Sequence, residues 1–146
     1  MVKIFYERDA KPEALKGKTI AILGYGSQGH AQAQNLRDSG HKVIIGLDPN
    51  RPSAQQARAD GMVVVAPDEA AKRSDWIHVL TPDETQAQVY EQSIKAYLHP
   101  GKVLGVSHGF SIHFKTGLYR DAQHDPPWTI YVDDYRKDQC LDSGCE

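Results

Sequence analysis

A short apolar run that leads directly into a glycine-rich turn constrains the fold of this chain more than any other feature. Residues 18–23 are rich in β-prone side chains. The pattern G-x-G-x-x-G follows at Gly24, Gly26 and Gly29, and helix formers continue to residue 39. Where such a pattern binds a dinucleotide, the first glycine permits a tight turn and the second lets the backbone approach a pyrophosphate. The third lets the helix pack closely on the strand. Glycine-rich turns are common, but this position between a strand and a helix predicts a dinucleotide-binding unit.

Strand-like and helix-like segments alternate along the first 114 residues. We predict strands at 18–23, 42–47, 62–65, 75–80 and 102–106, and helices at 12–15, 27–39, 53–60, 67–73 and 83–98. Such alternation is typical of a parallel sheet covered on both faces. The predicted fold is therefore α/β and Rossmann-like, a doubly wound, mostly parallel sheet with helices on both faces, formed by residues 1–114.

The last part of the chain, residues 115–146, does not continue this alternation. It contains an apolar run at 128–132 that would add one extra strand, followed by a polar end that we expect to be flexible. We predict a divergent tail here, with no helical C-terminal domain.

Composition excludes several classes of partner. The chain has 146 residues and a net charge of -2, so it fits one domain and carries no basic field for nucleic acid. No apolar run approaches the roughly 18 residues of a membrane span, and the first residues are too polar for a signal peptide. We expect a cytoplasmic protein that binds neither nucleic acid nor membrane.

The candidate cofactor site begins at the glycine-rich turn, where the predicted pyrophosphate cradle comprises Gly24, Tyr25, Gly26, Ser27, Gln28 and Gly29. A purely structural turn is the alternative.

The end of the second strand carries conflicting signals about the cofactor. Asp48 lies 19 residues beyond Gly29, where a carboxylate would accept a hydrogen bond from a ribose 2′-hydroxyl and favour NAD(H). Arg51 and Ser53 would instead favour the 2′-phosphate of NADP(H). We favour NADP(H) over NAD(H). An impaired pocket, or a simple solvated loop, stays open as an alternative.

Two further groups of residues follow later strands, at the edge where such sheets bind ligands. The segment 81–86 comes just after the fourth strand, and its candidate cofactor contacts are Asp83, Glu84, Thr85 and Gln86. Asp83 would serve equally well as a helix N-cap, or would do both. His108 follows the fifth strand. Most of the seven histidines are expected to be structural, but this position makes His108 a candidate to face a nicotinamide or a substrate.

Several longer motifs resemble those of the ketol-acid reductoisomerases (acetohydroxy acid isomeroreductases). They are K-G-K at 16–18, G-Y-G-S-Q-G-H-A-Q at 24–32, P-D-E at 82–84 and S-H-G-F-S-I-H-F at 107–114. The resemblance covers about residues 1–114. It implies the N-terminal cofactor module of an oxidoreductase of branched-chain amino acid biosynthesis. That family rearranges a 2-acetohydroxy acid with the help of magnesium and reduces the product with NADPH.

The resemblance also implies roles for single residues. Tyr25–Gln28 and Asp83–Gln86 would contact the cofactor, and His108 would be the active-site histidine. The positions that bind the 2′-phosphate fall on Asp48, Arg51 and Ser53. The first of these is usually arginine in the family, so the resemblance leaves the choice between NADPH and NADH open.

The resemblance stops after Phe114. The family continues into an A-P-K-G-P-G-like turn, whereas residues 129–134 here read T-I-Y-V-D-D. The magnesium ligands belong to a helical domain of the family, so we expect no metal site in this chain. We therefore expect NAD(P)H binding without turnover by the isolated chain. The alternative is a non-catalytic nucleotide-binding remnant of a truncated or frame-shifted gene. Because the family associates through the helical domain, a homodimer would use another surface.

Overall fold

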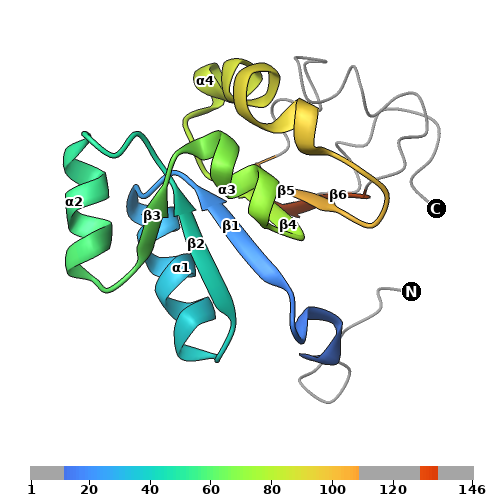
Figure 1. Cartoon of the computed structure of the whole chain (residues 1–146), viewed down its shortest axis with the longest axis horizontal. Helices are drawn as coiled ribbons and strands as arrows, with labels where there is room; N and C mark the ends of the chain where they lie inside the picture. The colour runs from blue at the N-terminus through green and yellow to red at the C-terminus, as the bar shows by residue number, and fades with distance from the viewer. Residues whose placement is uncertain (1–11, 109–128, 135–146) are drawn as a thin grey trace.

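One six-stranded parallel sheet organises the computed structural model, which describes residues 12–108 and 129–134. The strands are β1 (Thr19–Leu23), β2 (Lys42–Gly46), β3 (Val63–Val65), β4 (Trp76–Val79), β5 (Val103–His108) and β6 (Thr129–Asp134). Their order across the sheet is β3-β2-β1-β4-β5-β6, and every neighbouring pair is parallel (Figure 1). This is the strand order of the doubly wound dinucleotide-binding fold, so the predicted fold class is confirmed.

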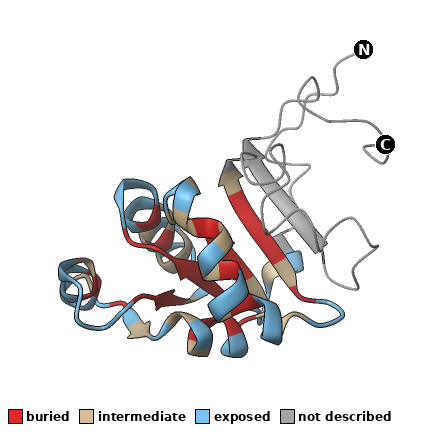
Figure 2. Cartoon of the chain, turned by 90° about the horizontal axis from the view of Figure 1, so that it is seen from above, coloured by how far each residue is buried: buried red, intermediate tan, exposed pale blue. Residues whose placement is uncertain are grey.

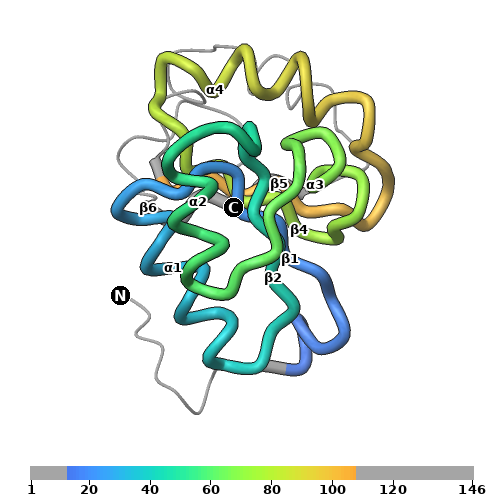
Figure 3. The backbone as a smooth tube through the Cα atoms, turned by 60° about the vertical axis from the view of Figure 1, so that its left-hand side comes forward, coloured from blue at the N-terminus to red at the C-terminus, as the bar shows by residue number. Residues whose placement is uncertain are grey.

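Helices cover both faces of the sheet. They are α1 (Ser27–Asp38), α2 (Pro52–Ala59), α3 (Pro67–Arg73) and α4 (Asp83–Val89), preceded by a short 3₁₀ turn, η2 (Pro12–Leu15). The chain runs outward from β1 to β3 and then returns to β4, so right-handed crossovers place α1 and α2 on one face and α3 on the other. Figure 3 shows α1 and α2 on one side of the strands and α3 on the opposite side.

Two apolar layers form the core, one on each face of the sheet. Figure 2 shows buried residues, in red, along the strands and on parts of the helices that cover them. All five residues of β1 are buried, as expected for a central strand covered on both faces. On the face of α1 and α2, the sheet packs against small alanine side chains of both helices. On the other face, it packs against α3 and the segment that follows α4. The fully buried helical residues of the first layer are Ala33, Ala54 and Ala57, and those of the second are Ala70, Ala71, Tyr90 and Ile94.

The predicted helix 83–98 is not one regular α-helix. After α4 the chain forms a π-helical turn, η3 (Tyr90–Ile94), and then a 3₁₀ turn, η4 (Lys95–Tyr97). The backbone N–H of Lys95 donates to the carbonyl of Tyr90, five residues earlier. Tyr90 and Ile94 are both buried in the layer beneath α3. Apolar periodicity predicts helix here, but it does not report the wider turn.

The predicted extra strand at 128–132 is present as β6, which pairs with β5 in parallel register. It therefore extends the same sheet. The predicted domain boundary at residue 114 and the polar end 135–146 lie outside the described residues. Among the described helices, none combines the length and the apolar character that a membrane crossing requires.

Candidate functional site

A cavity of about 520 Å³ lies at the carboxyl edge of the sheet, next to the ends of β1 and β4. In doubly wound sheets this edge is where ligands bind. Of the residues predicted from the sequence, those that line the cavity are Gly24, Tyr25, Gly26, Ser27, Gln28, Arg51, Ser53, Asp83 and Gln86. The structure therefore brings together three segments that are far apart in the chain.

The glycine-rich turn uses its first two glycines differently. Gly24 has a φ of 109°, and a Cβ there would lie 2.7 Å from the carbonyl oxygen of Leu80. Gly26 has an ordinary φ of -81°, and nothing lies within 4 Å of a Cβ at that position. Gly26 is also the N-cap of α1, which has no side-chain capping hydrogen bond. The turn therefore leaves the positive end of α1 open toward the cavity, which suits an anionic ligand.

Gly29 does not line the cavity. A Cβ at this position would overlap the carbonyl of Gly24 and contact Ile22 Cγ2. The third glycine thus lets α1 pack closely against the turn, the packing function expected of it. A direct contact between Gly29 and a cofactor remains a prediction.

In the loop after β2, the residues that favour NADP(H) and the residue that favours NAD(H) lie differently relative to the cavity. Arg51 and Ser53 line the cavity. Asp48 does not, and its Oδ1 instead accepts a hydrogen bond at 3.0 Å from the backbone N–H of Asn50. The guanidinium of Arg58 donates to the carbonyl oxygen of Pro49 at 3.1 Å and ties the loop to α2. The cation and the hydroxyl thus border the cavity, while the carboxylate is engaged by its own loop.

The segment that starts α4 contributes Asp83 and Gln86 to the cavity wall. The Nε2 of Gln86 donates to Asp83 Oδ1 at 3.0 Å and to the carbonyl of Thr81 at 3.1 Å. Glu84 and Thr85 do not line the cavity, and the Thr85 hydroxyl donates to the carbonyl of Pro82 at 2.8 Å. Asp83 is the first residue of α4, and the N-cap is Pro82, so the N-cap alternative for Asp83 is wrong.

Thr81 is a cavity residue that the sequence prediction did not include. Its Oγ1 is buried and has no hydrogen-bond partner within the described part of the chain. A buried hydroxyl without a partner costs about 1–3 kcal/mol, which a ligand atom in the cavity would offset. The position of Thr81 just past the predicted fourth strand, two residues after the end of β4, was the available signal. The other unpredicted lining residues are Leu47, Val79, Leu80, Pro82 and Ser107.

His108 is the last residue of β5, so the fifth strand is longer than predicted and includes this residue. The backbone of His108 pairs with Asp134 of β6. His108 comes one position after Ser107, which lines the cavity. The side chain of His108 lies outside the described residues, and its catalytic role remains a prediction. No group of histidine, cysteine, aspartate and glutamate side chains suited to a metal ion occurs in the described part of the chain.

Tyr25 has the strongest electrostatic perturbation near the cavity. Burial and the hydrogen bond to Asp60 raise the pKa of its hydroxyl to about 12. The phenol therefore stays protonated at neutral pH and donates to Asp60 Oδ2 at 3.0 Å.

Comparison with known proteins decides which dinucleotide-binding family this is. Residues 14–124 match the family described as "Acetohydroxy acid isomeroreductase, NADPH-binding domain". The chain belongs to this family. The predicted resemblance to the ketol-acid reductoisomerases is therefore confirmed for the cofactor domain.

Individual ketol-acid reductoisomerases show how much of such a protein the chain represents. It is 58% identical over 114 residues to the NADP(+) enzyme of Petrotoga mobilis, and 55% identical over 113 residues to that of Methanococcus maripaludis. These matches cover 78% and 77% of this chain but 34% of each relative. The chain thus spans about a third of the length of these relatives.

A solved ketol-acid reductoisomerase confirms the structural likeness. This NADH-preferring protein from an uncultured archean aligns with a TM-score of 0.74 and 46% sequence identity. The alignment covers 78% of this chain and 36% of that chain. The similar proteins thus include enzymes named for NADP(+) and one described as preferring NADH.

Proposed function

We propose that this chain binds NADP(H) as the cofactor module of a ketol-acid reductoisomerase. The observation that carries the proposal is the arrangement of the loop after β2. Arg51 and Ser53 border the cavity, whereas the Asp48 carboxylate accepts from Asn50. A cation and a hydroxyl suit a 2′-phosphate, and the Asp48 carboxylate does not line the cavity.

The residues of the cavity fit the remaining parts of such a cofactor. The turn from Gly24 to Gln28 and the uncapped start of α1 would hold the pyrophosphate. Thr81 and the Asp83–Gln86 segment would meet the ribose on the nicotinamide side, where the unpartnered Thr81 hydroxyl would gain a hydrogen bond. The bound cofactor supplies a hydride. His108 follows Ser107 at the same edge and would face the substrate.

The second candidate is a module that prefers NADH. Two observations favour it, the presence of Asp48 itself and the similarity to an NADH-preferring protein at 46% identity. In this case the Asp48 carboxylate would leave the Asn50 N–H and accept from a ribose 2′-hydroxyl instead.

We further propose that the chain by itself does not turn over a 2-acetohydroxy acid. Alkyl migration requires metal ions that polarise the oxygens of the substrate, and the described residues contain no candidate metal cluster. The similar enzymes are about three times as long as the matched segment. The alternative, a non-catalytic nucleotide-binding remnant, would also bind the cofactor without turnover.

Calorimetric titration of the full chain with NADPH and with NADH tests the cofactor proposal. We expect NADPH to bind more tightly, and Arg51→Ala to weaken NADPH about tenfold while leaving NADH nearly unchanged. Arg73→Ala is the matched control, because Arg73 is an exposed arginine on α3 that does not line the cavity. Tighter binding of NADH would support the second candidate. Absence of binding by either cofactor would overturn the proposed function.

Turnover is tested separately by following NADPH absorbance with 2-acetolactate and Mg²⁺. We expect no oxidation of NADPH by the pure chain. Magnesium-dependent oxidation at a rate above the buffer control would contradict the proposal that the chain by itself does not turn over a 2-acetohydroxy acid.

A further inference from the structure

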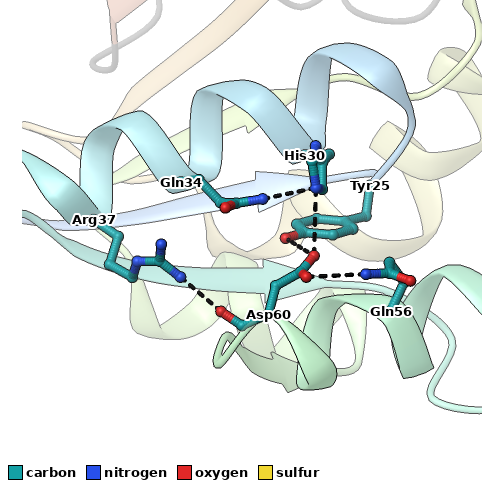
Figure 4. Close-up of polar contacts among 6 residues, drawn as sticks. All are labelled: Tyr25, His30, Gln34, Arg37, Gln56 and Asp60. Carbon is teal, nitrogen blue, oxygen red and sulfur yellow. Dashed lines mark hydrogen bonds and ion pairs between the residues drawn. The ribbon is translucent and has the colours of Figure 1, made fainter.

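Asp60, the C-cap of α2, joins three parts of the structure around the cavity (Figure 4). Its Oδ2 accepts from the Tyr25 hydroxyl at 3.0 Å, and its Oδ1 accepts from Gln56 Nε2 at 2.9 Å. Its backbone carbonyl accepts from the guanidinium of Arg37 on α1 at 2.6 Å. The glycine-rich turn, α1 and α2 therefore meet at one residue that does not itself line the cavity.

The hydrogen bond from Tyr25 is the strongest link of the Asp60 carboxylate to the rest of the fold. His30 Nε2 is 3.5 Å from Asp60 Oδ2, but the same nitrogen is 2.7 Å from Gln34 Nε2. One ring nitrogen does not accept from an amide N–H and donate to a carboxylate at the same time. Tyr25 is 6% exposed, so its bond to an ionised acceptor is shielded from water.

The hydrogen bond between Tyr25 and Asp60 acts at the C-terminal end of α2, so it affects how the whole helix is oriented relative to the cavity. The other end of the helix carries Arg51 and Ser53, which border the cavity. Across eight residues the helix is about 12 Å long, so a tilt at Asp60 displaces the opposite end. The core contacts of α2 come from the small side chains of Ala54 and Ala57.

We propose that Asp60 is a positioning residue for the dinucleotide, because its bond to Tyr25 sets the separation between the pyrophosphate turn and the Arg51–Ser53 end of α2. This inference rests on the proposed function. A complete dinucleotide touches both parts and needs the right separation between them. A fragment that touches only the end of α2 does not depend on this separation.

The test compares NADPH with 2′-AMP, which carries the adenosine end and its 2′-phosphate but no pyrophosphate. Tyr25→Phe removes one hydroxyl and keeps the ring, and Asp60→Ala removes the carboxylate. Each change should weaken NADPH binding about tenfold, because each breaks the charge-assisted hydrogen bond between Tyr25 and Asp60. The affinity for 2′-AMP should stay within about twofold in both variants. The double variant should bind NADPH no more weakly than the weaker single variant, because both changes break the same link.

Glu91→Gln is the control, since Glu91 is an exposed carboxylate that pairs with Lys95 on η4 at 3.2 Å. Its NADPH affinity should equal that of the wild type. Thermal melts of all variants accompany the titrations, and binding is compared well below each melting temperature.

Three results would overturn the inference. They are unchanged NADPH affinity in Tyr25→Phe, equal losses for NADPH and 2′-AMP, and additive losses in the double variant. A wild-type chain that fails to bind NADPH overturns the proposed function and this inference with it. If the wild type binds NADPH, any of the three results refutes the positioning role of Asp60 alone.

Discussion

Replacing each of the first two glycines of the turn by alanine should separate folding from cofactor binding. Gly24 has a φ of 109°, and an alanine Cβ would lie 2.7 Å from the Leu80 oxygen and 2.9 Å from the Leu80 carbonyl carbon. These are backbone atoms of the strand edge and cannot rotate away. Gly26 has neither problem, because its φ is -81° and nothing lies within 4 Å of a Cβ.

The expected cost of Gly24→Ala has two parts. Forcing alanine into the positive-φ region costs about 1–2 kcal/mol. Overlap with fixed backbone costs roughly another 1–3 kcal/mol. For a chain of 146 residues, the sum of about 2–5 kcal/mol lowers the melting temperature by about 10 °C. Gly26→Ala should change the melting temperature by no more than about 2 °C, since it alters only an N-cap without a side-chain bond.

NADPH binding should be weakened more by Gly26→Ala than by Gly24→Ala, the reverse of the order expected for their effects on the melting temperature. A methyl group at Gly26 projects into open space at the cavity, where the pyrophosphate would approach the backbone. We expect Gly26→Ala to weaken NADPH at least about tenfold. Circular-dichroism melts and calorimetric titrations measure the two effects. The reasoning is refuted if Gly24→Ala melts with the wild type, or if Gly26→Ala binds NADPH as the wild type does.

Two further predictions concern the stability of the fold at Gly105 of β5 and at Asp75, the residue before β4. Gly105→Ala should destabilise the fold by about 1–3 kcal/mol, because its Cβ would lie 2.5 Å from His78 Nδ1. The urea midpoint of the double variant with His78→Ala should show a smaller loss than the sum of the single losses, and additive losses would contradict this. The N–H of Thr19 and the nearby Lys18 hold the pKa of Asp75 below 3.8. Its stabilising contribution is therefore present above pH 3.8 and is lost as the pH falls through the lower folded value. Asp75→Asn should flatten that part of the stability curve in urea titrations between pH 6 and 2, and an unchanged curve would contradict this.

Local features of the chain were predictable from the sequence because they depend on neighbouring residues. The strand, the three glycines and the helix lie within twenty consecutive positions, so the turn and its closely packed helix followed from the pattern. The alternation of elements likewise predicted a parallel sheet. The extra strand near residue 130 was predictable from the apolar run at 128–132. The π-helical turn at Tyr90 was not predictable, because its wide hydrogen bond leaves the apolar periodicity nearly unchanged.

The sequence by itself therefore determined the doubly wound fold, the family of the cofactor domain and the segments that border the cavity. Only the tertiary structure decided how side chains in those segments are used. It placed the Asp48 carboxylate on its own loop, left the Thr81 hydroxyl without a partner, and joined Tyr25 to Asp60 across 35 positions of the chain. Fold class follows from the spacing of apolar residues and glycines along the chain. The orientation of a polar side chain depends instead on which distant groups the folded sheet brings within about 3 Å of it.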